Sequence, residues 1–150
     1  MLFRSKMARK TEIPIQKRFS DVDSFHHVNN VSQQMYFDVG KVDYYRRVLG
    51  EDVLFDRLRI ITVATSTSYL GQIRLEDEIA VTTVASKVGN KSVTLAQQLI
   101  HTAADGSRRV CSESTSVMVA FDFAAQQAVP VPDAWRKRML GDGTDSSHSR

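Results

Sequence analysis

Residues 21–30, DVDSFHHVNN, crowd two carboxylates, two imidazoles and two carboxamides into one predicted loop. The loop stands directly ahead of a predicted helix, and the free N–H groups and dipole of a helix N-terminus favour negative charge. Amides in that position can bind the oxyanion that forms when a carbonyl is attacked. A carboxylate a few residues upstream can activate water or attack the carbonyl itself. The side chains that together predict an acyl-transfer site are Asp23, His27, Asn29 and Asn30.

Structural roles compete with this interpretation at each position of the loop. Asp21 and Asp23 could cap turns, which is the commoner role of a single aspartate in a loop. Asn30 and Gln33 have the spacing of a capping box, so the sequence predicts that Asn30 caps the helix even if catalysis occurs beside it. Either histidine could simply face solvent. Because adjacent side chains point apart and no third ligand is suitably spaced, no metal site is predicted.

One long helix is predicted after the loop, from Val31 to Leu49, and Gly50 stands where a helix usually stops. Apolar residues recur at threes and fours and so share one face. A second apolar group lies on the opposite side. The first face comprises Val28, Val31, Met35, Val39, Val42 and Leu49, and the second Phe37, Tyr44 and Val48. Since a surface helix carries one apolar stripe, this helix should be covered on more than one side, by something curved or by a partner subunit.

Strand patterns occupy most of the remaining sequence. An alternating segment, EIPIQKRFS at 12–20, precedes the loop, and Pro14 confines it to an edge or a strand start. Four runs rich in Val, Ile and Thr follow the helix, and consecutive runs joined by short turns must be antiparallel. They are RIITVATSTSY, EIAVTTVASKV, KSVTLAQQLIHT and RRVCSESTSVMVAF. The sequence therefore predicts an α+β fold in which a curved antiparallel sheet of about five strands wraps one long central helix.

Composition limits the domain organisation and the classes of partner. The 150 residues suit one domain, which we place at 11–140 between a basic tail (1–10) and a polar, disordered C-terminal tail (141–150). Between residues 11 and 130 the net charge is −2, which argues against nucleic-acid binding. No apolar segment is long enough to cross a bilayer or to act as a secretory signal. With one cysteine, Cys111, expected to be buried, a cytoplasmic protein is predicted.

The segment RFSDVDSFHHVNNVSQQMYFDVGKVDYY (18–45) resembles the signature of the hotdog-fold acyl-CoA thioesterases, the hydroxybenzoyl-CoA thioesterase superfamily. Members of that family carry an Asp-x-Asp-x-x-Gly-His-Val-Asn-Asn loop ahead of a central helix. The resemblance continues through SYLGQIRLEDEIAVTTVASKVGNKSVTL and AFDFAAQQAVPVPDAW, and so covers residues 12–138. It implies a hotdog fold whose dimers join edge to edge, with active sites at the subunit interface and possible pairing of dimers into tetramers.

The resemblance also implies hydrolysis of acyl-coenzyme A thioesters without metal or cofactor; acyl carrier protein is an alternative carrier. Asp23 matches the catalytic carboxylate, as nucleophile or general base. His27 and Asn29 match the residues that orient the thioester or water. Backbone amides from His27 onward, including Val28 and Asn30, would polarise the carbonyl, and Lys91 matches a basic turn that meets coenzyme A phosphates or is an ordinary exposed lysine.

Three departures from the family pattern leave alternatives open. His26 replaces a frequent glycine and could narrow the acyl tunnel or reach the substrate. Gln33 replaces a frequent tyrosine, and residues 39–41 replace a common Glu-Ala-Arg, which leaves the acid–base work to Asp23. The alternatives to a thioesterase are an enoyl-thioester hydratase or dehydratase, and a non-catalytic protein that binds acyl thioesters.

Overall fold

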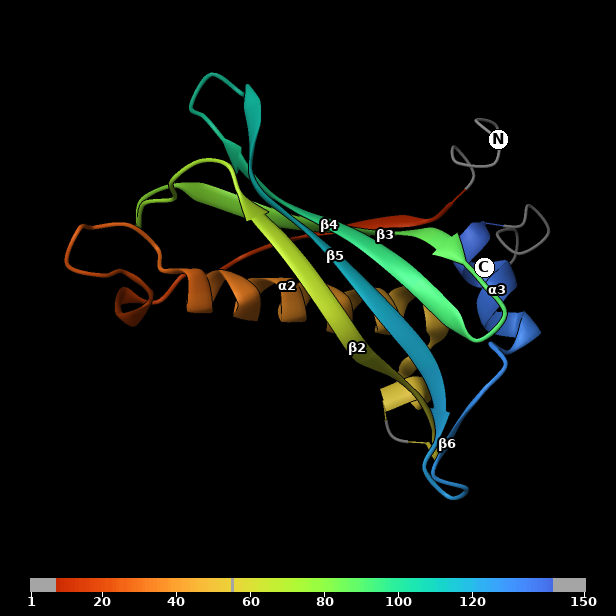
Figure 1. Cartoon of the computed structure of the whole chain (residues 1–150). Helices are drawn as coiled ribbons and strands as arrows, with labels where there is room; N and C mark the ends of the chain where they lie inside the picture. The colour runs from red at the N-terminus through yellow and green to blue at the C-terminus, as the bar shows by residue number, and fades with distance from the viewer. Residues whose placement is uncertain (1–7, 55, 142–150) are drawn as a thin grey trace.

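One long helix lies against a curved antiparallel sheet in the computed structural model, which describes residues 8–54 and 56–141 (Figure 1). The strand order is β1-β3-β4-β5-β2, and β6 pairs with β5. The strands are β1 (Lys10–Pro14), β2 (Leu58–Tyr69), β3 (Glu78–Val88), β4 (Ser92–Thr102), β5 (Arg108–Asp122) and β6 (Gln127–Val129). The predicted α+β architecture is confirmed, and the short β6 accounts for the sixth strand. The predicted tails fall largely on residues 1–7 and 142–150, outside the described residues.

The central helix is α2 (Asn30–Tyr44), continued by the π-helical turn η2 (Tyr45–Leu49). It confirms the helix predicted over 31–49. The smaller apolar face packs on the sheet, because Phe37, Tyr44 and Val48 are at most 2% exposed. Four residues of the larger face are instead 36–73% exposed in the protomer: Val31, Met35, Val39 and Val42. The sheet therefore covers one of the two predicted faces and leaves the middle of the other open to solvent, while Val28 and Leu49 at the two ends of that face are buried.

A glycine allows the helix to approach the sheet closely. A Cβ atom at Gly40 would lie 2.8 Å from a methyl group of Val81 and 2.9 Å from the side-chain nitrogen of Gln97. That nitrogen donates a hydrogen bond to the backbone carbonyl of Phe37, at 2.9 Å. The sheet thus hydrogen-bonds to the helix backbone one turn before the glycine, which fixes the depth at which α2 sits.

The sheet edges are β1 and β2. The prediction of an edge strand at Pro14 is confirmed, but the strand ends there rather than continuing to residue 20. After a last backbone hydrogen bond from Ile15 to the Ile79 carbonyl, at 2.8 Å, the chain leaves the sheet, and Phe19 is 85% exposed. The short helical turn η1 (Phe19–Asp21) then leads into the loop ahead of α2.

The opposite end of the helix closes on a second helical cluster. The turn η3 (Glu51–Leu54) follows η2, and α3 (Asp133–Leu140) is a short helix near the C-terminal end of the described residues. Cys111 is fully buried, as expected, and burial raises the pKa of its thiol.

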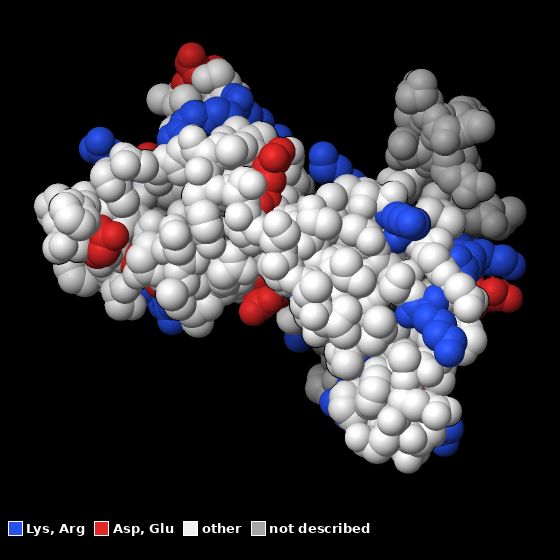
Figure 2. Space-filling view, in the orientation of Figure 1, with Lys and Arg blue, Asp and Glu red and all other residues white. Residues whose placement is uncertain are grey.

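No helix among the described residues is both long and apolar enough to span a membrane. The face in Figure 2 shows separate small groups of basic and acidic side chains and no continuous basic surface.

Candidate functional site

The loop ahead of α2 is held in place by the buried carboxylate of Asp21. This side chain is 1% exposed and accepts hydrogen bonds from the Tyr36 hydroxyl at 2.6 Å, the Ser32 hydroxyl at 3.0 Å and the Arg18 guanidinium at 2.9 Å. Burial by itself would raise the pKa of Asp21, but these hydrogen bonds, with that from the Arg18 backbone, lower it to about 2. Asp21 therefore anchors the loop and is not free to exchange a proton near neutral pH.

Asp23 lies in the turn that follows. Its Oδ1 accepts a hydrogen bond from the Phe25 backbone N–H at 2.9 Å and a longer one from that of His27 at 3.4 Å. His26 closes the turn with a φ of 67°, in the left-handed region that favours glycine. This is the position where the resembled family has glycine. The Asp23 side chain is exposed in the protomer, and its Oδ2 has no hydrogen-bond partner among the described residues.

The helix and its cap both begin one residue earlier than predicted. Asn29, not Asn30, is the N-cap, and its side-chain oxygen accepts a hydrogen bond from the Ser32 backbone N–H at 2.7 Å. The predicted capping box of Asn30 and Gln33 is therefore wrong. Asn30 is the first helical residue, and Gln33 is buried against the sheet, where Ser112 donates to its side-chain oxygen.

Only some of the backbone amides expected to polarise a carbonyl are available. The Val28 N–H donates to the Ile73 carbonyl at 2.7 Å, and the Asn29 N–H donates to the Asp21 carbonyl at 2.9 Å. These contacts correct the expectation for Val28 and Asn29. Within residues 8–54 and 56–141, the N–H groups of Asn30 and Val31 have no acceptor. They belong to the first turn of α2, where a helix leaves its donors unsatisfied.

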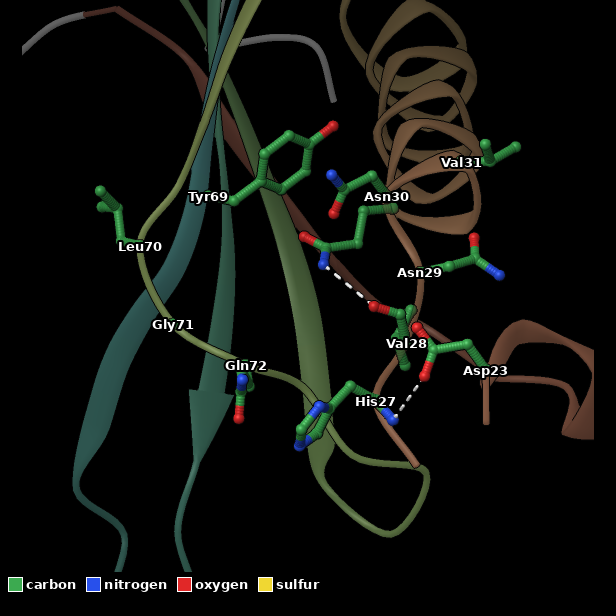
Figure 3. A pocket seen from close by; sticks show the side chains of 11 residues that line it. Asp23, His27, Val28, Asn29, Asn30, Val31, Tyr69, Leu70, Gly71 and Gln72 are labelled. Atoms are coloured by element: carbon green, nitrogen blue, oxygen red, sulfur yellow. Dashed lines mark hydrogen bonds between the residues drawn. The ribbon is translucent and has the colours of Figure 1, made fainter. Parts of the chain in front are cut away.

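A cavity of about 500 Å³ joins Asp23 to this first turn (Figure 3). One wall is the loop and the start of α2, and the other is the segment from Tyr69 to Gln72 at the end of β2. Figure 3 shows the Tyr69 and Asn30 side chains directed toward each other across the space, while Val31 points away from it. The lining residues are Asp23, His27, Val28, Asn29, Asn30, Val31, Gln33, Tyr69, Leu70, Gly71 and Gln72. A carboxylate and free amides on one cavity can carry out acyl transfer.

A protein-family model that matches most of the chain identifies the family to which the chain belongs. A model of the thioesterase-like superfamily matches residues 18–139. The chain belongs to this superfamily. Solved thioesterases share its architecture, so the α+β fold described above is the hotdog fold of that superfamily.

Individual relatives in the thioesterase-like superfamily are distant. A predicted thioesterase from Bacillus stearothermophilus is 25% identical, with a TM-score of 0.76 over 87% of this chain and 94% of that one. 4-Hydroxybenzoyl-CoA thioesterase, as a mutant in complex with 4-hydroxybenzoyl CoA, is 15% identical, with a TM-score of 0.78 over 88% and 99% of the two chains. The uncharacterized protein YsmA of Bacillus subtilis is 30% identical over 83 residues, which is 54% of each chain.

Most of the predicted site residues of this thioesterase-like protein come together. Asp23, His27, Val28, Asn29 and Asn30 all line the cavity, whereas His26 does not. No cluster of three or more potential metal ligands occurs in the part of the chain that the structure describes.

Lys91 lies at the other end of the sheet. Its neighbour Ser92 pairs with Val119 of β5, whereas Tyr69, beside the cavity, pairs with Ser112 of the same strand. The seven residue steps from Ser112 to Val119 span about 23 Å at about 3.3 Å per residue. Lys91 therefore does not reach the cavity within one protomer, and its role stays a prediction.

The sequence-based reasoning missed one wall of the cavity and part of its floor. Tyr69 is the last residue of β2, and Gly71 and Gln72 follow it along the chain; no local pattern links that segment to the loop. The position of Gln33 could have been predicted from its helical spacing. It precedes Phe37 by four residues and therefore lies on the buried face of the helix.

Proposed function

We propose that this protein hydrolyses acyl-coenzyme A thioesters to a free acid and a thiol. One observation carries the proposal: Asp23 lines the same cavity as Asn30 and Val31, whose backbone amides have no acceptor among the described residues. Membership of the thioesterase-like superfamily supports it, and a relative in complex with 4-hydroxybenzoyl CoA supports coenzyme A as the carrier. Acyl carrier protein remains the alternative carrier.

In the proposed reaction the thioester oxygen lies against the amides of Asn30 and Val31. Asp23 removes a proton from water, and the water oxygen bonds to the carbonyl carbon. The oxyanion is held by the two amides, as in other acyl transfers. The carbon–sulfur bond then breaks, and the thiolate takes the proton from Asp23. Direct attack by Asp23, followed by hydrolysis of the anhydride, gives the same products.

The neighbouring polar residues take different parts in this proposal. The His27 side chain, directed into the space beside the loop in Figure 3, orients water or the thioester. The Asn29 side-chain oxygen caps the helix at 2.7 Å, so Asn29 positions the amides through this oxygen. His26 does not line the cavity, so contact between its side chain and the substrate requires the acyl group or a second subunit to approach the turn.

We also propose a homodimer joined along β2, alone or as half of a tetramer. β2 is an edge strand with an exposed apolar residue, Val63 at 57%; Leu70, which directly follows the strand, is 60% exposed, and α2 exposes an apolar stripe. In a two-fold dimer the two copies of β2 run antiparallel. The Tyr69 end of one protomer would then lie near the Leu58 end of the other. This arrangement would bring Lys91 of one protomer toward the site of the other.

The test of the proposed function is Asp23→Asn, which keeps the turn-capping oxygen and removes the base. We expect thiol release from acyl-CoA substrates to fall at least about a hundredfold in kcat. The matched control is Asp105→Asn, because Asp105 also caps an exposed turn, through the Ser107 N–H at 3.0 Å. Full activity of Asp23→Asn would contradict the proposal. Consumption of the crotonyl-CoA double bond without thiol release would indicate a hydratase instead.

A further inference from the structure

A buried carboxamide forms part of the cavity floor. Gln33 lines the cavity and is 3% exposed. Its Oε1 accepts a hydrogen bond from the Ser112 hydroxyl at 2.8 Å, and Ser112 is itself fully buried. This contact holds the amide with its oxygen toward β5 and its nitrogen toward the loop.

The side-chain nitrogen of Gln33 can donate more hydrogen bonds than it makes to the described residues. Its one acceptor among the described residues is the Val28 carbonyl, at 3.5 Å (dashed line at Val28 in Figure 3). A side-chain amide carries two N–H donors, so one of them makes a long contact and the other has no acceptor in the part of the chain that the structure describes. A buried donor left without a partner destabilises the state that contains it. A ligand oxygen in the cavity would supply the missing acceptor.

Most of the cavity lining is also polar, since seven of the eleven lining residues carry polar side chains: Asp23, His27, Asn29, Asn30, Gln33, Tyr69 and Gln72. One of them, Tyr69, is held by a residue outside the lining. The Gln34 side-chain nitrogen donates to Thr67 at 2.9 Å and to the Tyr69 hydroxyl at 3.0 Å. Polar side chains therefore line most of a cavity in which a site for a long alkyl chain would present aliphatic side chains.

The position of Gln33 relates this polar floor to the reacting carbonyl. Asn30, whose amide would hold the carbonyl oxygen, lies three residues earlier on the same helix. Side chains three apart on a helix are neighbours, with about 5–6 Å between their Cβ atoms. Gln33 also contacts the carbonyl of Val28, in the loop that carries Asp23. An acyl substituent that accepts a hydrogen bond from the Gln33 side chain must therefore lie close to the thioester carbonyl.

We propose that the acyl group is short and carries a hydroxyl or oxo oxygen within its first few carbons, and that the Gln33 amide nitrogen donates to this oxygen. The inference rests on the proposed thioesterase function and deepens it. A site built to hydrogen-bond a substrate oxygen discriminates strongly against the analogue that lacks it, because its own polar groups are then left unpaired. Gln33 is thus the residue that sets acyl specificity.

The first experiment compares racemic 3-hydroxybutyryl-CoA with butyryl-CoA, which has the same carbon skeleton, by thiol release from the full-length protein. We expect kcat/KM to be at least about tenfold higher for the hydroxylated substrate. Equal values, or a preference for butyryl-CoA or octanoyl-CoA, would overturn the acyl assignment while leaving the thioesterase proposal intact. Release of thiol from none of a series from acetyl-CoA to palmitoyl-CoA, including these substrates, would overturn both.

The second experiment assigns the preference to Gln33. Gln33→Met keeps the length of the side chain and removes the donor, so the ratio of the two kcat/KM values should fall toward 1. Gln97→Met is the control, because Gln97 is equally buried but its nitrogen donates to Phe37 and Thr83 away from the cavity. The ratio does not depend on the fraction of protein that is folded. An unchanged ratio in Gln33→Met would contradict the role of Gln33.

Discussion

At the scale of single residues, two aspartates two positions apart have opposite environments. Asp21 is buried among three hydrogen-bonding side chains, whereas Asp23 is exposed at a cavity with one oxygen unpaired among the described residues. The difference follows from the direction of each side chain relative to α2. The Asp21 side chain faces Tyr36 and Ser32 on the helix. The Asp23 side chain instead caps a turn in the loop that precedes the helix. One residue anchors the loop, and the other is available for chemistry.

The anchor predicts a pH-dependent loss of stability. Because the folded-state pKa of Asp21 is about 2, below the ordinary value of 3.8, its contribution is present above about pH 4 and is lost as the pH falls toward 2. We expect Asp21→Asn to lower the free energy of unfolding by about 2 kcal/mol at pH 7. Urea denaturation at pH 7 and pH 2.5 should show this deficit shrinking at the lower pH. An equal deficit at both values would show that the carboxylate charge is not responsible.

At the scale of elements, the start of α2 depends on one asparagine of an adjacent pair. Asn29 supplies the cap through its contact with the Ser32 N–H, and Asn30 already has helical geometry. We expect Asn29→Ala to lower the free energy of unfolding by about 1 kcal/mol, because a capping acceptor is lost. Asn30→Ala provides the comparison and should cost much less. Thermal or urea unfolding of the two variants would contradict this assignment if Asn30→Ala were the more destabilised.

The middle of the same helix depends on the absence of a side chain at Gly40. In Gly40→Ala the new methyl group would lie within 2.9 Å of Val81 and Gln97. We expect a loss of about 1–3 kcal/mol in the free energy of unfolding, because overpacking outweighs the higher helix propensity of alanine. Gly89→Ala is the control, since its Cβ would meet Ser92 only at ordinary contact distances of 3.4 Å and above. Equal free energies of unfolding for Gly40→Ala and the parent protein would show that the helix and the sheet can move apart at little cost.

At the scale of the whole molecule, the protomer leaves its central helix incompletely covered. The exposed stripe on α2 and the unpaired edge of β2 are the features expected of a surface that a second copy covers. Because the cavity lies at the end of β2, the proposed dimer would place a second subunit beside it. Assembly and activity should therefore be lost together.

This coupling is tested by placing charges on the stripe. In Met35→Lys/Val42→Lys, two ammonium groups would have to be buried by a partner, so we expect the double variant to be monomeric and at least about tenfold less active. Sedimentation velocity and thiol release measure the two effects. Thr115→Lys, which adds charge to an exposed position of β5 between buried neighbours, should change neither. A dimeric double variant would contradict the proposed interface.

The sequence by itself determined the α+β architecture of a curved antiparallel sheet around one long helix, the extent of that helix and the grouping of Asp23, His27 and Asn29. These features depend on hydrophobic periodicity and on residues close together in the chain. Only the tertiary structure decided which apolar face of α2 is buried, because both faces fit a helical period and the choice depends on contacts with distant strands. The same dependence on distant contacts explains why Ile73 and Asp21 occupy the Val28 and Asn29 amides, and why Gln33 and Tyr69 meet at one cavity.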